Sequence, residues 1–358
     1  MLVKSKYSFD EALTGIISLN LMIMKKPAGF LLVLILLIFL LQCCKKEKLP
    51  QITTTDPYAI DAFSAISGGI IGSDGGSAIV SKGVCWNTSQ NPTLLDSYTI
   101  ENTGSDMFSS TMTGLYPEKW YYARAYATNE IGTGYGNQVS FKTTGSITFN
   151  TSLNYGSVMD IDGNTYKTIQ IGSQTWMAEN LKTTRFNNDT EIPLVTSGTG
   201  WNVLTTPGYC WYSNDNYISR ITYGALYNWF TVVAGNLCPA GWHVSTDDDW
   251  EMMVSFLGGV PEHFQRKLKE TGTTHWYLNT PGQLHDATNS CGFTALPGGL
   301  RGGNGNFAQI RSEGHWWTSD EFDATNSHSR SLYFYDVGGS SEYYPKFIGF
   351  SVRCVKYN

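Results

Sequence analysis

The chain has 358 residues, enough for two domains of ordinary size and a processed leader. Only 15% of the residues are charged, while Gly, Tyr and Trp are abundant, a balance typical of β-rich extracellular modules rather than helical cytosolic enzymes. The net charge of −6 and the absence of a basic stripe argue against a nucleic-acid partner.

The N-terminal segment has the pattern of an export signal. An apolar run from Phe30 to Leu41 follows Lys25 and Lys26 and ends just before Cys43 and Cys44. About a dozen apolar residues are too few for a spanning helix and suit the core of a signal peptide. The end of the run resembles a bacterial lipoprotein signal, in which a lipid-carrying cysteine becomes the new N-terminus.

Residues 1–44 are therefore expected to be a signal and lipoprotein segment. Cys44 is the expected lipidation site, because Leu41 lies three residues before it and the small Cys43 directly before it. Cys43 is the alternative site, and an uncleaved membrane anchor is the alternative interpretation of the segment. Met24 would give a normal charged start, so we expect the true start there. The predicted mature protein is held at the outer membrane by its acyl chains and exposed at the cell surface.

Residues 45–51 form a short charged tether, and residues 52–144 are predicted to form one all-β domain. Leu115, Pro117 and Tyr121 have the spacing of the E–F corner of fibronectin type III domains, which this stretch resembles. A β-sandwich acting as a spacer is expected, with Cys85 as a buried free thiol. The alternative is a binding face formed by Tyr122, Arg124 and Tyr126, which alternate onto one side of a strand.

After a polar linker at residues 145–152, the second domain is expected to span residues 153–358. Its first part predicts three strands joined by tight turns. Asp160, Asp162 and Asn164 have the spacing that begins a calcium loop, but Lys167 and Thr168 follow instead of further oxygen ligands. A hairpin turn is therefore favoured.

Tyr223 to Val233 carries apolar residues at helical spacing, which predicts an amphipathic helix packed on a sheet. A strand is expected around Trp242 to Val244. Thr246 or Ser245 then caps a second helix whose first turn holds Asp247, Asp248 and Asp249. Carboxylates in a first helical turn complement the macrodipole, so these aspartates need no metal or catalytic role.

Six motifs occur in order in the second domain: DIDGNTYKTIQIGSQTWMAENLKTT, GYCWYSND, YGALYNW, CPAGWHVSTDDDW, GFTALPGG and GFSVRCV. Together they resemble the Fibrobacter succinogenes major paralogous domain, found in secreted proteins and lipoproteins. The CPAGWH and Arg-Cys motifs are similar to the C-type lectin-like superfold, which also contains formylglycine-generating enzymes. The resemblance implies an α+β second domain and a disulfide between Cys238 and Cys354. It leaves Cys210 and Cys291 either paired or free.

Tryptophans beside polar segments are the candidate ligand contacts, because aromatic faces and hydrogen-bonding groups together suit sugars. Lectin-like calcium sites use Asp, Asn and Glu near a Trp, so Asp320 and Glu321 join the candidates and calcium is a possible cofactor, although the usual calcium tripeptides are absent. Packing of these tryptophans in the core is the alternative. The ligand-binding candidates are Trp211, Trp276, Trp316, Trp317, Asp320 and Glu321.

The sequence contains no nucleophile elbow, Walker loop or zincin motif, so no catalytic residue is predicted. The expected fold is mainly β, a fibronectin III-like sandwich followed by a C-type lectin-like α+β domain. The leading hypothesis is a surface-anchored, non-catalytic lipoprotein that binds a polysaccharide or glycoconjugate. The alternatives are a protein-interaction subunit of a cell-surface assembly and, less favoured by the residues, a sulfatase-modifying enzyme.

Overall fold

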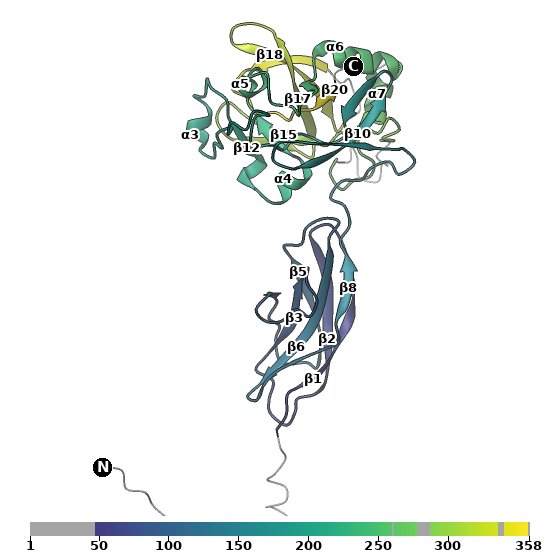
Figure 1. Cartoon of the computed structure of the whole chain (residues 1–358), viewed down its shortest axis with the longest axis vertical. Helices are drawn as coiled ribbons and strands as arrows, with labels where there is room; N and C mark the ends of the chain where they lie inside the picture. The colour runs from purple at the N-terminus through teal and green to yellow at the C-terminus, as the bar shows by residue number, and fades with distance from the viewer. Residues whose placement is uncertain (1–46, 260, 278–286, 336–339, 357–358) are drawn as a thin grey trace, which may run out of the picture. The chain divides into compact units, whose positions relative to one another are not determined.

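The computed structural model describes residues 47–259, 261–277, 287–335 and 340–356 (Figure 1). The chain divides between Thr144 and Gly145 into two compact units. The expected lipidation sites, Cys43 and Cys44, lie outside the described residues. Within the described ranges, no helix combines the length and apolar character needed to cross a membrane.

The first unit is a β-sandwich of two antiparallel sheets, as the sequence predicts. One sheet has the order β1–β2–β5 and the other β4–β3–β6–β7, with β8 also paired to β6. The strands are β1 (Gln51–Tyr58), β2 (Ser64–Ser73), β3 (Ser81–Asn87), β4 (Ser97–Tyr98), β5 (Met107–Thr113), β6 (Trp120–Asn129), β7 (Gly132–Tyr135) and β8 (Val139–Lys142). Their inward-facing residues form a core that includes Val84, Met112 and Ala123.

A tyrosine corner joins the two sheets of the first unit, in line with the fibronectin type III-like pattern. The Tyr121 hydroxyl accepts a hydrogen bond from the amide of Tyr116 at 3.0 Å. Leu115 is fully buried beside it, and Tyr121 stacks on Phe141 with ring centroids 5.8 Å apart. The predicted local geometry is confirmed.

The alternative binding face of this unit is largely occupied by internal contacts. Tyr126 is buried, and its hydroxyl donates to the carbonyl of Thr99 at 2.7 Å. The Arg124 guanidinium lies 4.7 Å from the ring centroid of Tyr135. The alternative prediction, a binding face that includes an exposed Tyr126 ring, is therefore wrong.

The second unit combines three sheets with short helices, and the predicted α+β class is confirmed. The first five-stranded sheet has the order β14–β20–β11–β10–β9, the second β16–β15–β17–β18–β19, and β12 pairs with β13. The strands are β9 (Gly156–Met159), β10 (Thr165–Ile171), β11 (Gln174–Met177), β12 (Tyr209–Trp211), β13 (Ala225–Tyr227), β14 (Trp242–Val244), β15 (Gly298–Arg301), β16 (Phe307–Ile310), β17 (Glu313–Glu321), β18 (Asn326–Tyr333), β19 (Ser340–Pro345) and β20 (Cys354–Lys356).

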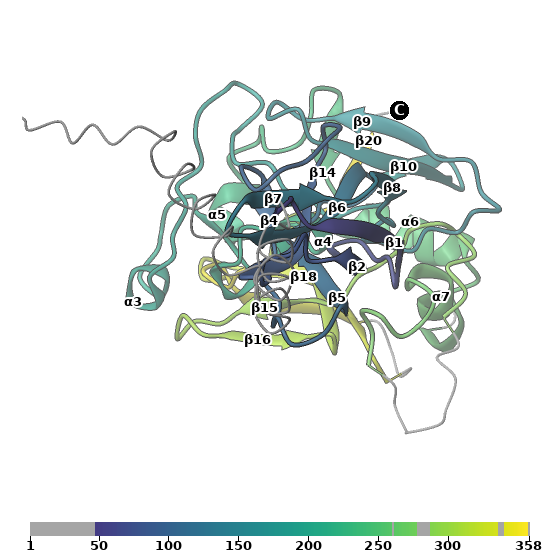
Figure 2. The ribbon, with the colours of Figure 1, turned by 90° about the horizontal axis from the view of Figure 1, so that it is seen from below.

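Helices of the second unit are short. The two longest, α6 and α7, lie side by side at one edge (Figures 1 and 2). The helical segments are α3 (Gly198–Trp201), the 3₁₀ turn η1 (Tyr212–Asn214), α4 (Ile218–Thr222), α5 (Trp229–Val232), α6 (Asp247–Phe256) and α7 (Pro261–Leu268).

The segment expected to be a linker is partly fixed to the second unit. The amide of Thr148 donates to Glu270 Oε1 at 2.6 Å, and Asn150 Nδ2 donates to the carbonyl of Asn289 at 3.1 Å. Phe149 packs against one of the two main cores of this unit. Residues 148–150 therefore belong structurally to the second unit.

The favoured hairpin at Asp160 is present. Asp160 accepts hydrogen bonds from the amide of Asn164 at 2.9 Å and from the hydroxyl of Tyr166 at 2.5 Å, while Gly163 adopts a φ of +79° in the turn. Asp162 instead accepts from the amide of Thr184 at 2.6 Å. The carboxylates thus fix the turn between β9 and β10 rather than converging on one point.

The predicted helix over residues 223–233 is wrong. Residues 225–227 form β13, which pairs with β12, and only α5 at residues 229–232 is helical. Gly224 has a φ of +76°, and Asn228 caps α5 by accepting from the amide of Thr231. Nearly every residue of this stretch is buried, so the helical spacing of its apolar residues did not mark a single buried face.

The predicted capped helix is confirmed as α6. Thr246 is its N-cap and forms a capping box with Asp249, and Asp247 to Asp249 occupy the first turn. The α6 side chains Trp250 and Met253 enter the core. Asp249 of this capping box also lies 2.8 Å from Nε2 of His243 on the neighbouring strand β14.

The disulfide between Cys238 and Cys354 is present, as the family resemblance implied. It links the loop before β14 to β20, two segments 116 residues apart. Cys85, Cys210 and Cys291 are free. Burial raises the pKa of Cys85 to about 11 and that of both Cys210 and Cys291 to about 12, so all three are neutral thiols at pH 7.

Candidate functional site

The four tryptophans predicted to contact a ligand are buried, so their predicted role as exposed platforms is wrong. Trp276, Trp316 and Trp317 are fully buried and Trp211 nearly so. The indole N–H groups of Trp276, Trp316 and Trp317 donate to Ala295 O, Asn180 Oδ1 and Tyr227 O, each at 2.9 Å. A large ring with an internal acceptor for its N–H is a core residue.

Asp320 and Glu321 also have structural partners. Asp320 Oδ2 accepts from the amide of Asp247 at the start of α6, at 2.6 Å. Glu321 pairs with Lys346, which also donates to the carbonyl of Ala324 at 3.0 Å. Among the described residues, no group of three or more His, Cys, Asp or Glu side chains could hold a metal ion.

The exposed aromatic surface lies immediately beyond these two acids. Phe322, the first residue after β17, stacks on Tyr343 of β19 with ring centroids 4.2 Å apart and planes 7° apart. The side chains are 48% and 58% exposed. His328, directly opposite Tyr343 in the β18–β19 pairing, packs edge-on against Phe322 at 5.3 Å. We call these three residues the aromatic shelf.

A rigid turn holds the shelf in place. Asp323 Oδ1 accepts from the amides of Thr325 and Asn326, both at 2.7 Å. Hydrogen bonds from the Asn326 side chain and from these amides hold the pKa of Asp323 far below its ordinary value, so it is charged at neutral pH. The turn therefore presents Phe322 together with fixed polar groups.

A hollow of about 520 Å³ opens beside the disulfide. Val232, Leu237 and Val244 contribute apolar side chains to its lining, together with the half-buried Trp242. Its polar lining comes from β14, the α6 cap and β17. We call it the disulfide hollow, and its complete lining is Val232, Gly235, Leu237, Cys238, Trp242, His243, Val244, Thr246 and Ser319.

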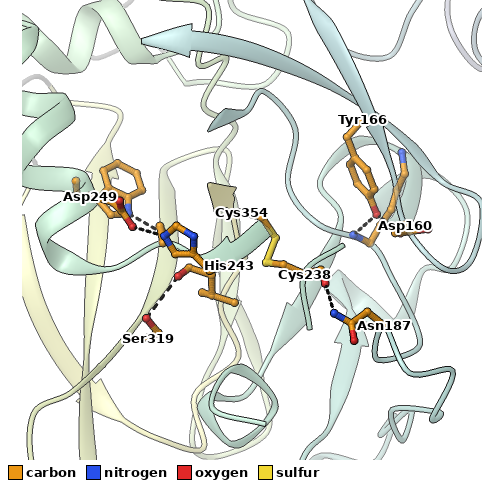
Figure 3. Close-up of a disulfide and its surroundings, with 12 residues drawn as sticks. Asp160, Tyr166, Asn187, Cys238, His243, Asp249, Ser319 and Cys354 are labelled. Carbon is orange, nitrogen blue, oxygen red and sulfur yellow. Dashed lines mark hydrogen bonds and ion pairs between the residues drawn. A yellow bond between two sulfur atoms is a disulfide. The ribbon is translucent and has the colours of Figure 1, made fainter. Parts of the chain in front are cut away.

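His243 in this hollow is fixed by the α6 cap. Its Nε2 lies 2.8 Å from Asp249 Oδ2, and Figure 3 shows the imidazole turned toward Asp249 with the disulfide on its other side. Burial alone would raise the pKa of Asp249, but hydrogen bonds from His243 and Thr246 lower it below its ordinary value. Asp249 is therefore an anion at neutral pH and fixes the imidazole ring.

A second hollow, of about 610 Å³, lies between two loops over Tyr209. Arg185 on its wall pairs with Asp189 at 2.7 Å and lies 3.6 Å from Asp162. The Tyr209 ring is buried, so this hollow offers no aromatic face to a ligand. It is the weaker candidate for a site that binds sugar rings.

The described residues also contain a buried serine–histidine–glutamate chain of hydrogen bonds. Ser331 Oγ lies 2.7 Å from His315 Nδ1, and His315 Nε2 lies 2.9 Å from Glu313. Ser331 Oγ also donates to Glu342 at 3.3 Å. Ser331 and His315 are each only 1% exposed, so the hydroxyl cannot meet a substrate without movement of the strands. We interpret these hydrogen bonds as a structural link between the buried polar side chains of β17, β18 and β19.

The family description "Fibrobacter succinogenes major domain" matches residues 169–356, which include the shelf and the hollow. The chain belongs to this family. The match covers the tight turn before β11, the disulfide, the α6 cap and the β17–β19 sheet. In this Fibrobacter succinogenes major domain, the residues of the shelf and of the hollow lie within the matched range.

No curated protein matches the chain. Among solved structures, one described as a myokine is 16% identical and covers 28% of this chain and 99% of its own, with a TM-score of 0.21. The sensor domain of the anti-sigma factor RsgI4 of Pseudobacteroides cellulosolvens is 18% identical over 27% of this chain and 96% of its own, with a TM-score of 0.21. A human fibronectin type III domain, the sixth of a fibronectin type III domain containing protein 3, is 23% identical over 27% and 82%, with a TM-score of 0.19.

Two of the residues predicted to contact a ligand, Asp320 and Glu321, lie directly before the aromatic shelf, whereas the predicted tryptophans lie in the core. Phe322 directly follows the predicted Asp320 and Glu321, and it is the one large apolar residue in the stretch from Glu321 to Asn326. An apolar ring inside a polar turn between strands was the available signal. Tyr343 had no comparable signal, because it meets Phe322 only through the pairing of β18 with β19.

Proposed function

We propose that this protein is a surface-anchored lipoprotein whose second unit binds polysaccharide without catalysis. The observation that carries the proposal is the aromatic shelf, an exposed, stacked pair of rings on a rigid sheet, flanked by fixed polar groups. Sugar rings have apolar C–H faces edged with hydroxyls, which suit an aromatic surface beside hydrogen-bonding groups. Anchoring through Cys44, with the first unit as a spacer, would hold the shelf outside the membrane.

A polysaccharide-binding assay on the purified full-length chain tests this function. Binding of the wild-type protein to a panel of insoluble and soluble polysaccharides is measured in the presence of calcium and in the presence of chelator. Binding is expected to weaken at least tenfold in Phe322→Ala and in Tyr343→Ala, because each change removes a ring contact of about 1.5 kcal/mol. Chelator is expected to leave binding unchanged, because Asp320 and Glu321 have protein partners.

Phe256→Ala is the matched control, since Phe256 is a 65% exposed phenylalanine of the same unit on α6. It should bind polysaccharide as the wild type does. The proposal fails if no polysaccharide binds to the folded protein, or if both shelf variants bind like the wild type.

Docking of a protein partner is the second candidate function, and the outer side of α6 is what favours it. Met252 and Phe256 are 51% and 65% exposed there, and Phe256 also covers Gly172 in the β10–β11 turn. Two adjacent exposed apolar side chains suit a protein contact. In cross-linking on intact cells, loss of a cross-linked partner in Phe256→Ala, with unchanged partner recovery in Phe322→Ala, would support this function.

A further inference from the structure

The disulfide hollow and the aromatic shelf are connected by β17. Ser319 of β17 lines the hollow, and Phe322 of the shelf is the first residue after β17. Thr246 also lines the hollow, and the next residue, Asp247, accepts a hydrogen bond at 3.3 Å from Ser341, which lies on the same face of β19 as Tyr343 of the shelf. One oligosaccharide of a few linked rings could therefore contact both.

The hollow has the size and wall of a subsite for one ring. Its volume of about 520 Å³ falls within the usual range of small-molecule sites. Trp242 contributes a half-buried aromatic side chain to the lining, and the apolar lining residues need no hydrogen bonds from an occupant. A ring with an apolar face on one side would be accommodated there.

The two hydroxyl groups that line the hollow donate their protons to other protein atoms, but their oxygens can still accept hydrogen bonds. Thr246 Oγ1 donates to Asp249 Oδ2 at 2.9 Å, and Ser319 Oγ donates to the carbonyl of Val244 at 3.4 Å. Each hydroxyl oxygen has two lone pairs, and that of Thr246 accepts one hydrogen bond, from the amide of Asp249. An occupant must therefore supply donors, as the hydroxyls of a sugar do.

Carboxylates dominate the charge around both features. The acids carried by α6, by the end of β17 and by the turn after it are Asp247, Asp248, Asp249, Glu251, Asp320, Glu321 and Asp323. The cations beside them, Arg330 and Lys346, are engaged: Arg330 pairs with Asp247 and Glu251, each at 2.7 Å, and Lys346 pairs with Glu321. Asp249 and Asp323 remain ionised at neutral pH because hydrogen bonds lower their pKa values. An anionic ligand would meet like charge at both features.

We propose that the shelf and the hollow together bind an uncharged glycan, with one sugar ring seated in the hollow against Trp242. This inference rests on the proposed polysaccharide binding and adds its chemical class and a second subsite. Glycans rich in uronic acid or sulfate are disfavoured by the carboxylates. Shorter oligosaccharides that reach only the shelf bind more weakly than longer ones that also fill the hollow.

The test uses full-length protein and titration calorimetry with neutral oligosaccharides of increasing length from the polysaccharide that binds best. Polygalacturonate and alginate serve as acidic probes. Wild-type affinity is expected to rise at least tenfold with length until both features are filled, and the acidic probes are expected to bind at least tenfold more weakly. Trp242→Ala should abolish the gain with length while leaving the affinity of the shortest ligand unchanged.

Trp242 also packs against the core, so Trp242→Ala can weaken folding as well as binding. A second variant that retains Trp242 separates these two effects. Ser319→Leu fills the hollow and should remove the same gain with length. Asp248→Lys should narrow the difference between neutral and acidic probes, whereas Asp56→Lys, an equal charge change at an exposed position of the first unit, should not.

The outcomes separate the two proposals. If ligands bind at the shelf but length dependence survives both hollow variants, or acidic probes bind as tightly as neutral ones, this inference is overturned and polysaccharide binding stands. If the wild type binds no glycan, or Phe322→Ala binds like the wild type, polysaccharide binding at the shelf fails and the inference fails with it.

Discussion

Removing the Cys238–Cys354 cross-link should destabilise the second unit alone. The bridge joins residues 116 apart, and closing a loop of that length in the unfolded chain corresponds to about 5 kcal/mol in the chain-entropy model. With a urea dependence of about 2.5 kcal/mol per molar for a unit of this size, the second unit's midpoint should fall by about 2 M. The first unit has no cysteine in the bridge and should unfold at the same urea concentration as before.

Tryptophan fluorescence can follow the second unit in the full-length chain. Only Trp86 and Trp120 of the 11 tryptophans lie between residue 1 and Thr144. Comparing oxidised with reduced wild-type protein isolates the cross-link, because both sulfur atoms remain in the core. A double variant, Cys238→Ala with Cys354→Ala, should match the reduced protein to within the loss of two small contacts and should not respond to reductant.

The reasoning would be refuted by a midpoint of the second unit that moves by less than about 0.5 M on full reduction. It would also be refuted if the first unit's transition moved by the same amount, because the loop closed by the bridge lies wholly in the second unit.

Two further predictions concern buried groups of the second unit. Arg353 is fully buried and donates hydrogen bonds to the carbonyls of Met177, Phe293 and Thr294. Arg353→Met should therefore lower the free energy of unfolding, measured by urea denaturation, by about 3 kcal/mol or more. A decrease of less than about 1 kcal/mol would contradict this. Burial raises the pKa of Cys210 and Cys291 from 9.0 to about 12, so between these values the unfolded chain releases thiol protons that the folded protein keeps. The two thiols therefore favour the folded state fully below about pH 9, and this contribution to the free energy of unfolding is lost as the pH rises toward 12. The stability of the second unit should fall across that window, and Cys210→Ala should make the fall shallower; an unchanged slope would count against the assignment.

Features built from neighbouring residues were predictable from the sequence. The tyrosine corner, the hairpin at Asp160 and the α6 capping box each depend on side chains within six residues of one another, so spacing alone identifies them. The α+β class and the disulfide followed from motifs shared with a family. These local patterns and motifs determined the division of the chain into β-rich units.

The interior and exterior positions of the aromatic residues were decided only by tertiary structure. Trp316 and Trp317 are adjacent in sequence and point to opposite faces of β17, yet both are buried, because one face packs against Trp250 of α6 and the other against Phe350. Nothing local distinguishes such a doubly covered strand from one that has an exposed face.

The same reason explains the helix predicted at Tyr223 and the missed shelf. Residues 225–227 became a strand because β12 supplies its backbone partners, a contact that periodicity cannot reveal. Phe322 and Tyr343 meet because β18 lies between β17 and β19, and the register of those pairings sets which side chains are neighbours. The sequence alone thus determined the local turns, caps and fold class, while long-range strand pairing decided which rings fill the core and which remain exposed to a ligand.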